Sequence, residues 1–169
     1  MRKIKSERLT MRLLKMRDWR RLAALDADFS ASPYAAYDLP WPKDRRGIKR
    51  LTRQFVRTRL FFAVLLDRKM IGYVCFCEEE DSYDLSYLIH SAHWGQGYAK
   101  ESVAAAMDFV KKTEAVTTFT AVTARENLPS CKLLLRLGFQ EAGRQTVSFF
   151  KDEKGEDISF EAVNFEKSV

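Results

Sequence analysis

The stretch IHSAHWGQGYAKESVAAAMDFV, residues 89–110, constrains the fold most, because it joins an apolar run to a helix through a turn that holds Gly95 and Gly97. The whole chain contains only seven glycines. A glycine inside a helix or strand costs roughly 0.5–1 kcal/mol relative to alanine. We therefore expect this turn to need bare main chain for a purpose other than regular structure.

The helix after the turn is predicted over residues 97–111. Its apolar residues recur at the spacing of one buried helix face, and they are Ala99, Val103, Ala106, Met107 and Val110. A β-branched run predicts a strand at 116–124. The segment NLPSCKLLLRLGF predicts a further helix, with Asn127 as its N-cap and Gly138 just after its last turn.

The other elements follow from the same kinds of pattern. They are an extended segment at 4–15, a helix at 17–28, a loop at 29–44, a basic helix at 44–58, hairpin strands in 60–66 and 70–78, a strand at 83–90 and two last strands at 142–150 and 156–166. This order predicts an α/β (α+β) fold, with a central mixed, mostly antiparallel sheet and helices on both faces. No interior linker is visible, so we expect one domain over residues 1–169.

Composition excludes several classes of protein. No apolar run approaches the roughly 20 residues of a membrane span, and the basic N-terminus never enters the apolar part of a signal peptide. Three cysteines, an odd number, indicate reduced thiols and a cytoplasmic protein. Because the chain has only two histidines and no Cys-x-x-Cys pair, we expect no metal site.

The net charge of +6 is concentrated in the first third of the chain, where residues 1–60 hold 17 Lys and Arg against 6 Asp and Glu. On the helix predicted at 44–58 the basic residues share one side, and they are Arg46, Lys49, Arg50, Arg53 and Arg57. Such a face is either solvated or a contact surface for a polyanion, such as an acidic protein, ribosomal RNA or the phosphates of a cofactor.

A strand that enters a helix through glycines can bind an anion, because the first N–H groups of the helix are unpaired and its dipole is positive there. The nucleotide P-loop pattern is absent from the chain. The dinucleotide fingerprint would need a third glycine where Lys100 stands. A third pattern, Gln/Arg-x-x-Gly-x-Gly/Ala, does place small residues at Gly95, Gly97 and Ala99.

That third pattern is the coenzyme A loop of the GCN5-related N-acetyltransferase (GNAT) family, which HWGQGYAKES resembles. Trp94 departs from the strict pattern, but a tryptophan is usual in the branch of ribosomal-protein alanine and serine N-acetyltransferases. The segments SERLTMRLL, YDLSYLIH, ENLPSCKLLLRLGF and EDISFEAVNFE resemble further motifs of that branch, in the family order. The resemblance runs from about residue 6 to residue 165.

The resemblance implies direct transfer of acetyl from acetyl-CoA to a primary amine, without a covalent enzyme intermediate. It also implies the set of residues that bind acetyl-CoA. They are Leu88, Ile89, Trp94, Gly95, Gln96, Gly97, Tyr98, Ala99, Lys100, Asn127 and Ser130. His90 and His93 match no catalytic position of the family, and Lys100 and Arg125 are equally well explained as surface charges.

The same resemblance assigns the catalytic roles. Asp84 takes the place of a family glutamate as the base, and it would act through water because its side chain is one methylene shorter. The alternative is that Asp84 has no catalytic role and only forms a hydrogen bond with a turn. The N–H near Leu88 would polarise the thioester carbonyl. Ser130 would protonate the departing sulfur, because Leu134 stands where many relatives carry a tyrosine that acts as the general acid. The alternative is that Ser130 only satisfies an unpaired N–H at the start of its helix.

The acceptor is predicted from amine chemistry. A protein α-amine, with a pKa near 8, is about one-tenth neutral at pH 7, whereas a lysine amine is neutral about once in 10³ molecules. We therefore expect a protein N-terminus, acidic or ribosomal, in a pocket walled by Tyr34, Tyr37 and Trp41. A polyamine or aminoglycoside is the alternative, and a non-catalytic CoA-binding or RNA-associated protein is a weaker one. No membrane and no direct nucleic-acid partner is expected, and both a monomer and a homodimer remain open.

Overall fold

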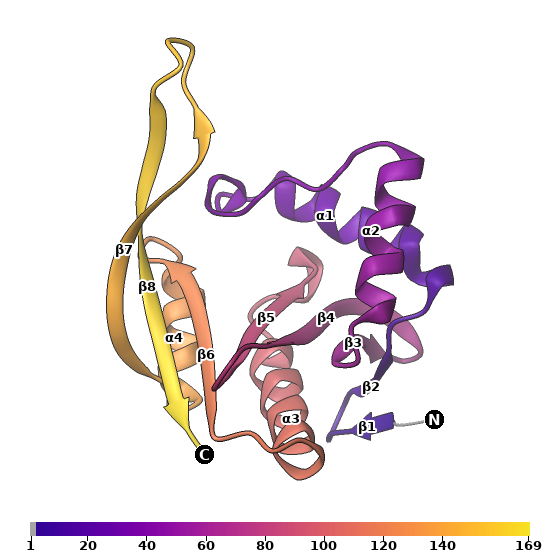
Figure 1. The fold of residues 1–169 in the computed structure, drawn as a ribbon. Helices are drawn as coiled ribbons and strands as arrows, with labels where there is room; N and C mark the ends of the chain where they lie inside the picture. Colours follow the sequence, from indigo (N-terminus) through magenta and orange to yellow (C-terminus); the bar gives the residue numbers. More distant parts are fainter. Residues whose placement is uncertain (1–2) are drawn as a thin grey trace.

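The computed structural model describes residues 3–169, which form an eight-stranded sheet with helices packed on it (Figure 1). The strands are β1 (Lys3–Lys5), β2 (Thr10–Leu13), β3 (Phe61–Leu66), β4 (Lys69–Glu78), β5 (Tyr83–Ile89), β6 (Thr118–Ala124), β7 (Gln140–Lys151) and β8 (Asp157–Ser168). The helices are α1 (Trp19–Ser30), α2 (Arg45–Arg57), α3 (Tyr98–Thr113) and α4 (Leu128–Arg136), with three short 3₁₀ turns η1 (Met16–Asp18), η2 (Ala35–Tyr37) and η3 (Ser91–His93).

The sheet runs β1-β2-β3-β4-β5-β6-β8-β7, and every neighbouring pair is antiparallel except β5 and β6. The predicted fold class is therefore confirmed. Both faces of the sheet carry helices because alternate residues of a central strand are apolar on each face. On β3, Phe61 and Ala63 belong to the apolar cluster under α1, whereas Phe62 and Val64 belong to the larger cluster under α3.

The predicted helix caps are confirmed. At α4 the side chain of Asn127 accepts a hydrogen bond from the Ser130 N–H at 3.3 Å. The helix ends at Arg136, and Gly138 follows with φ +86°. The Gly138 N–H bonds to the Leu135 carbonyl oxygen at 3.0 Å, and the Phe139 N–H bonds to the Leu134 carbonyl oxygen at 3.1 Å. This pair of bonds is the Schellman arrangement that a glycine followed by an apolar residue favours.

The parallel strands β5 and β6 are paired at only two positions, Tyr83 with Phe119 and Asp84 with Thr120. Beyond Asp84 they diverge, so β5 leaves an unpaired edge toward β6. Residues 85–89 of β5 and 121–124 of β6 instead line a cavity. The splay of the strands therefore opens a site in the middle of the sheet.

Two features differ from the sequence prediction. The extended segment predicted at 4–15 is two strands, β1 and β2, because a turn closed by the Ser6 N–H bond to the Leu9 carbonyl separates them. The last two strands are longer than predicted and form a hairpin that projects beyond the rest of the sheet (Figure 1).

Candidate active site

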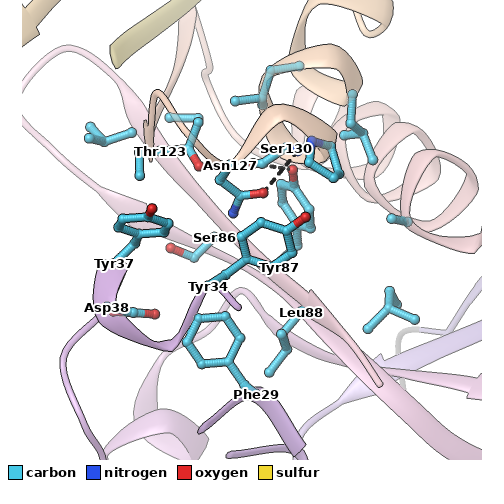
Figure 2. A pocket seen from close by; sticks show the side chains of 18 of the residues that line it. Phe29, Tyr34, Tyr37, Asp38, Ser86, Tyr87, Leu88, Thr123, Asn127 and Ser130 are labelled. Atoms are coloured by element: carbon cyan, nitrogen blue, oxygen red, sulfur yellow. Dashed lines mark hydrogen bonds between the residues drawn. The ribbon is translucent and has the colours of Figure 1, made fainter. Parts of the chain in front are cut away.

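A cavity of about 860 Å³ occupies the gap between β5 and β6. Its walls come from the loop between α1 and α2, the start of α3, the first turns of α4 and the hairpin β7–β8. Figure 2 shows aromatic side chains on one side of this space and the start of α4 on the other. The residues predicted from the sequence that line it are Tyr34, Tyr37, Trp41, Leu88, Ile89, Trp94, Gly95, Gly97, Tyr98, Ala99, Lys100, Asn127 and Ser130.

The glycine turn leads into α3 through a left-handed main chain. Gly95 has φ +72° and Gly97, the N-cap of α3, has φ +81°. A side chain is strained at these angles, which explains why the turn uses glycine at both positions. No side chain caps α3, so the N–H groups at its first turn are available to a ligand beside the cavity. This end of α3 therefore suits the diphosphate of coenzyme A.

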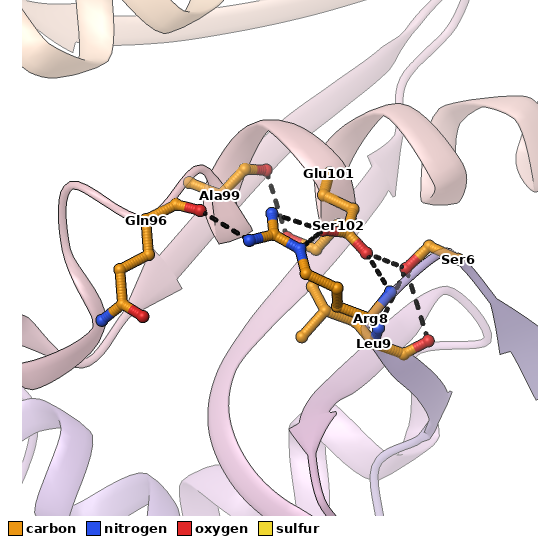
Figure 3. Close-up of polar contacts among 7 residues, drawn as sticks. All are labelled: Ser6, Arg8, Leu9, Gln96, Ala99, Glu101 and Ser102. Carbon is orange, nitrogen blue, oxygen red and sulfur yellow. Dashed lines mark hydrogen bonds and ion pairs between the residues drawn. The ribbon is translucent and has the colours of Figure 1, made fainter.

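Arg8 holds the turn in place (Figure 3). Its guanidinium donates to the Gln96 carbonyl oxygen at 3.0 Å and forms an ion pair with Glu101 of α3 at 2.7 Å. Burial raises the pKa of Glu101, but hydrogen bonds from the Arg8 main chain, from Ser6 and from the Arg8 side chain outweigh it, so the net pKa is lowered. The β1–β2 turn thus clamps the start of α3.

Replacing Arg8 by alanine is expected to raise the KM for acetyl-CoA roughly tenfold, the equivalent of one charge-assisted hydrogen bond, with kcat little changed. The Gln96 carbonyl would lose its partner, so the turn would lose its fixed geometry. Steady-state kinetics with varied acetyl-CoA measure this. Arg125→Ala is the control, because Arg125 pairs with Glu161 outside the cavity. An unchanged KM for Arg8→Ala would show that the turn holds its shape without the clamp.

The β5 register revises the prediction for the N–H of Leu88. Leu88 is opposite Tyr73, and the N–H of His90, two residues on, bonds to the Ile71 carbonyl of β4. Because polar groups of an antiparallel strand alternate in direction, the Leu88 N–H points to β4 as well. The main-chain groups of Tyr87 and Ile89 face the gap instead, and the Ile89 carbonyl accepts from the Trp94 indole there at 2.6 Å. Figure 2 shows the side chain of Leu88 among those that line the cavity.

Ser130 lies at the start of α4, where two bonds fix it. Its N–H is bonded to Asn127, and its hydroxyl lies 2.8 Å from the hydroxyl of Tyr87 (Figure 2). Leu134, which stands where relatives carry a tyrosine, is buried in the core at 1% exposure. The tyrosine partner of Ser130 therefore comes from β5, which sequence reasoning did not find.

Asp84 does not line the cavity, although it shares a strand face with Ser86, which does. Its carboxylate accepts a hydrogen bond from the Thr120 hydroxyl at 3.4 Å. Burial, and secondly the charge of Glu79, raise the pKa of Asp84 from its ordinary 3.8 to about 6, against the opposing effect of Thr120. The position fits a base that acts through water and excludes direct contact with an acceptor in the cavity.

The aromatic residues predicted for the acceptor wall have different partners. Tyr34 packs against Trp94 with ring centroids 6.0 Å apart, and Tyr37 packs against Phe160 of β8 at 5.2 Å. Trp41 also stacks on Tyr73, in the apolar cluster under α1. Trp41 thus serves both the wall and the core.

Asp26 and Asp38 are the acidic residues of the cavity lining. Asp26 is paired with Lys43 at 2.6 Å, whereas within residues 3–169 the Asp38 side chain bonds only to the N–H of Leu39. Burial, and to a lesser extent the charge of Asp26, raise the pKa of Asp38. Sequence reasoning missed Asp38, because nothing local marks it as different from the other acidic residues of loops.

Gln96 was predicted to bind acetyl-CoA, whereas His90 and His93 match no catalytic position of the family. Gln96 is not part of the cavity lining. Its side-chain amide donates a hydrogen bond to the Ala92 carbonyl oxygen at 3.5 Å. The Nδ1 atom of His90 accepts a hydrogen bond from the Ala92 N–H at 3.2 Å. His93 lines the cavity. Within residues 3–169 no group of His, Cys, Asp and Glu could hold a metal ion. In the same range no helix is long and apolar enough to cross a membrane.

A sequence profile described as an acetyltransferase (GNAT) domain matches residues 8–140. The chain belongs to the GNAT family. It is therefore an acetyl-CoA-dependent N-acetyltransferase, and the splayed strands and uncapped α3 fit that donor. The p20 N-acetyltransferase of Bacillus licheniformis is 27% identical over 146 residues, which cover 82% of each chain.

Solved GNAT structures share the fold at low identity. The ribosomal-protein-S5-alanine acetyltransferase of Vibrio fischeri superposes with a TM-score of 0.82 and 19% identity, covering 99% of this chain and 97% of that one. The spermidine N-acetyltransferase of Vibrio cholerae, solved with CoA and spermine, gives 0.79 and 20%, with 95% of each chain covered. One fold thus serves protein and small-molecule acceptors, and the GNAT family alone does not identify the acceptor here.

Proposed function

We propose that this GNAT enzyme is a cytoplasmic acetyltransferase of protein N-terminal α-amines, like the ribosomal-protein branch. The observation that carries the proposal is the charge of the cavity lining. Its carboxylates are Asp26, which Lys43 already neutralises, and Asp38. One unpaired carboxylate among aromatic rings suits one ammonium group. A polyamine would bring several ammonium groups and find no further carboxylate among the described residues that line the cavity.

The proposed reaction uses residues on both sides of β5. Asp38 holds the incoming ammonium, and Asp84 accepts its proton through water near Ser86. The N–H groups of Tyr87 and Ile89 that face the gap stabilise the oxyanion formed at the thioester carbonyl. Ser130 gives a proton to the departing sulfur.

The basic surface of α2 favours an acceptor peptide whose residues after the N-terminus are acidic. Lys49 and Arg45 lie over the ring of Trp19 at 5.1 and 5.7 Å. Neither these cations nor Arg50 and Arg53 pair with a carboxylate within the described part of the chain. Trp41 of the cavity wall packs on Phe55 of α2 at 5.3 Å, so α2 adjoins the wall through its apolar side, and the basic face lies on the other side of the helix. It does not line the cavity, so it is not placed to bind coenzyme A there.

Acetylation of peptides and of spermidine separates the two acceptor classes. We expect kcat/KM for a peptide with a free alanine or serine N-terminus and acidic following residues to exceed that for spermidine by tenfold or more. The same peptide with basic following residues should fall between them. Mass spectrometry of the products locates the acetyl group. A preference for spermidine would overturn the proposal, and no turnover of any amine would favour a non-catalytic CoA-binding protein.

Charge reversal on α2 provides the control for that assay. Arg50→Glu with Arg53→Glu should lower kcat/KM for the acidic peptide and leave that for a neutral peptide unchanged. Lys111→Glu with Lys112→Glu makes the same charge change at the exposed end of α3 and should leave both unchanged. An equal loss in both double variants would indicate a general field effect instead of a contact surface.

A further inference from the structure

The hydroxyl of Tyr87 has no role in the mechanism so far, yet it lies in the cavity wall. Tyr87 is on β5 and Ser130 on α4, and the two hydroxyl oxygens are 2.8 Å apart. Asn127 fixes the main chain of Ser130 through its N–H, so the serine hydroxyl has a defined position relative to the tyrosine. The contact joins two elements that line opposite sides of the gap.

The alternation of β5 separates this pair from the proposed base. Asp84, Ser86 and Leu88 project from one face of the strand, whereas Tyr87 projects from the other. Tyr87 packs with the core under α3 and α4, and Leu88 with the core under α1. An acceptor that enters beside α1 and a sulfur that leaves beside α4 would therefore meet different side chains of one strand.

We propose that Tyr87 is a positioning residue that orients the Ser130 hydroxyl and replaces the proton that Ser130 gives up. This inference rests on the proposed role of Ser130 as the acid. When the tetrahedral intermediate collapses, the C–S bond breaks and its electron pair goes to sulfur. Sulfur takes the Ser130 proton, and the serine oxygen takes the Tyr87 proton. Solvent in the open cavity then reprotonates the phenolate, which balances the proton that the amine lost to the base.

The acidity of the two hydroxyls supports this direction of transfer. A phenol, with an ordinary pKa near 10, is a far stronger acid than an aliphatic alcohol. Burial raises the pKa of Tyr87 to about 12, although the bond with Ser130 opposes the rise. Tyr87 therefore stays protonated at neutral pH and remains the better proton source of the two. A lone serine would instead have to carry the full alkoxide charge.

The test is a cycle of variants, Tyr87→Phe, Ser130→Ala and the double variant. Each single change is expected to lower kcat by about 10²-fold, within the range for general acid catalysis, and to leave the KM for acetyl-CoA within about threefold. Because the two hydroxyls act as one unit, the double variant should be no slower than the slower single variant. Site-specific 3-fluorotyrosine at position 87 keeps the hydroxyl and should restore kcat. Thermal midpoints show whether each variant is folded.

The outcomes separate this inference from the proposed function. Turnover by the unchanged enzyme with its best acceptor tests acetyl transfer without reference to Tyr87. Wild-type kcat in Tyr87→Phe would overturn the inference alone. Losses that multiply in the double variant would also overturn it, because they would show independent roles. If fluorotyrosine fails to restore kcat while the protein is folded, the hydroxyl is not the source of the proton.

Discussion

Replacing Gly97 by alanine is expected to weaken the binding of coenzyme A by tenfold or more. The N-cap of α3 has φ +81°, where an L-residue costs roughly 1–2 kcal/mol. The main chain can relieve that strain only by turning away from the left-handed region, which redirects the N–H groups at the start of α3. Since 1.4 kcal/mol corresponds to a factor of ten in affinity, loss of one charge-assisted bond to phosphate is sufficient for the effect.

Gly155→Ala is the matched control for this change. Gly155 lies in the turn between β7 and β8, has φ +83°, and an added Cβ there would meet no atom within 4 Å. It carries the same main-chain strain far from the glycine turn. Calorimetry with coenzyme A and thermal unfolding of both variants separate binding from stability. If Gly97→Ala loses stability as Gly155→Ala does and binds coenzyme A normally, the turn does not cradle the diphosphate.

The features that the sequence predicted well depend on neighbouring residues. Gly95 and Gly97 were identified because glycine adopts a positive φ without strain, and both angles are positive. Asn127 and Gly138 were identified because caps are set within one helical turn. The buried face of α3 follows from a spacing of three and four residues. Local rules of this kind also carried the resemblance to the GNAT family.

The features that the sequence missed depend on residues brought together from far apart. Tyr87 meets Ser130 across 43 positions, and Asp38 differs from other loop carboxylates only through its place in the cavity lining. The role of the Leu88 N–H was assigned from the resemblance to the GNAT family, but the direction of this N–H is decided by the β4–β5 register. A register is a pairing between two strands, so the sequence of one strand alone does not fix it.

Replacing Asp84 by asparagine is expected to lower kcat at pH 7.5 by about 10²-fold, the lower end of the range for general base catalysis. The amide keeps the size of the side chain and its contact with Thr120 but cannot accept a proton. Asp38→Asn is the comparison, since Asp38 lines the cavity and is proposed to hold the ammonium. That variant should raise the KM for the acceptor more than it lowers kcat.

The pH dependence of kcat distinguishes the two carboxylates, because only the base must be ionised for the chemical step. Burial raises the pKa of Asp84 to about 6, so its active carboxylate form is lost as the pH falls through that value. With saturating acceptor, kcat should fall about tenfold per pH unit below 6 in the wild type and in Asp38→Asn. In Asp84→Asn this fall should disappear. A fall near pH 6 that survives in Asp84→Asn would transfer the base role to another group. Because the acceptor α-amine titrates near pH 8, its own ionisation is separated from that of Asp84 by about two units.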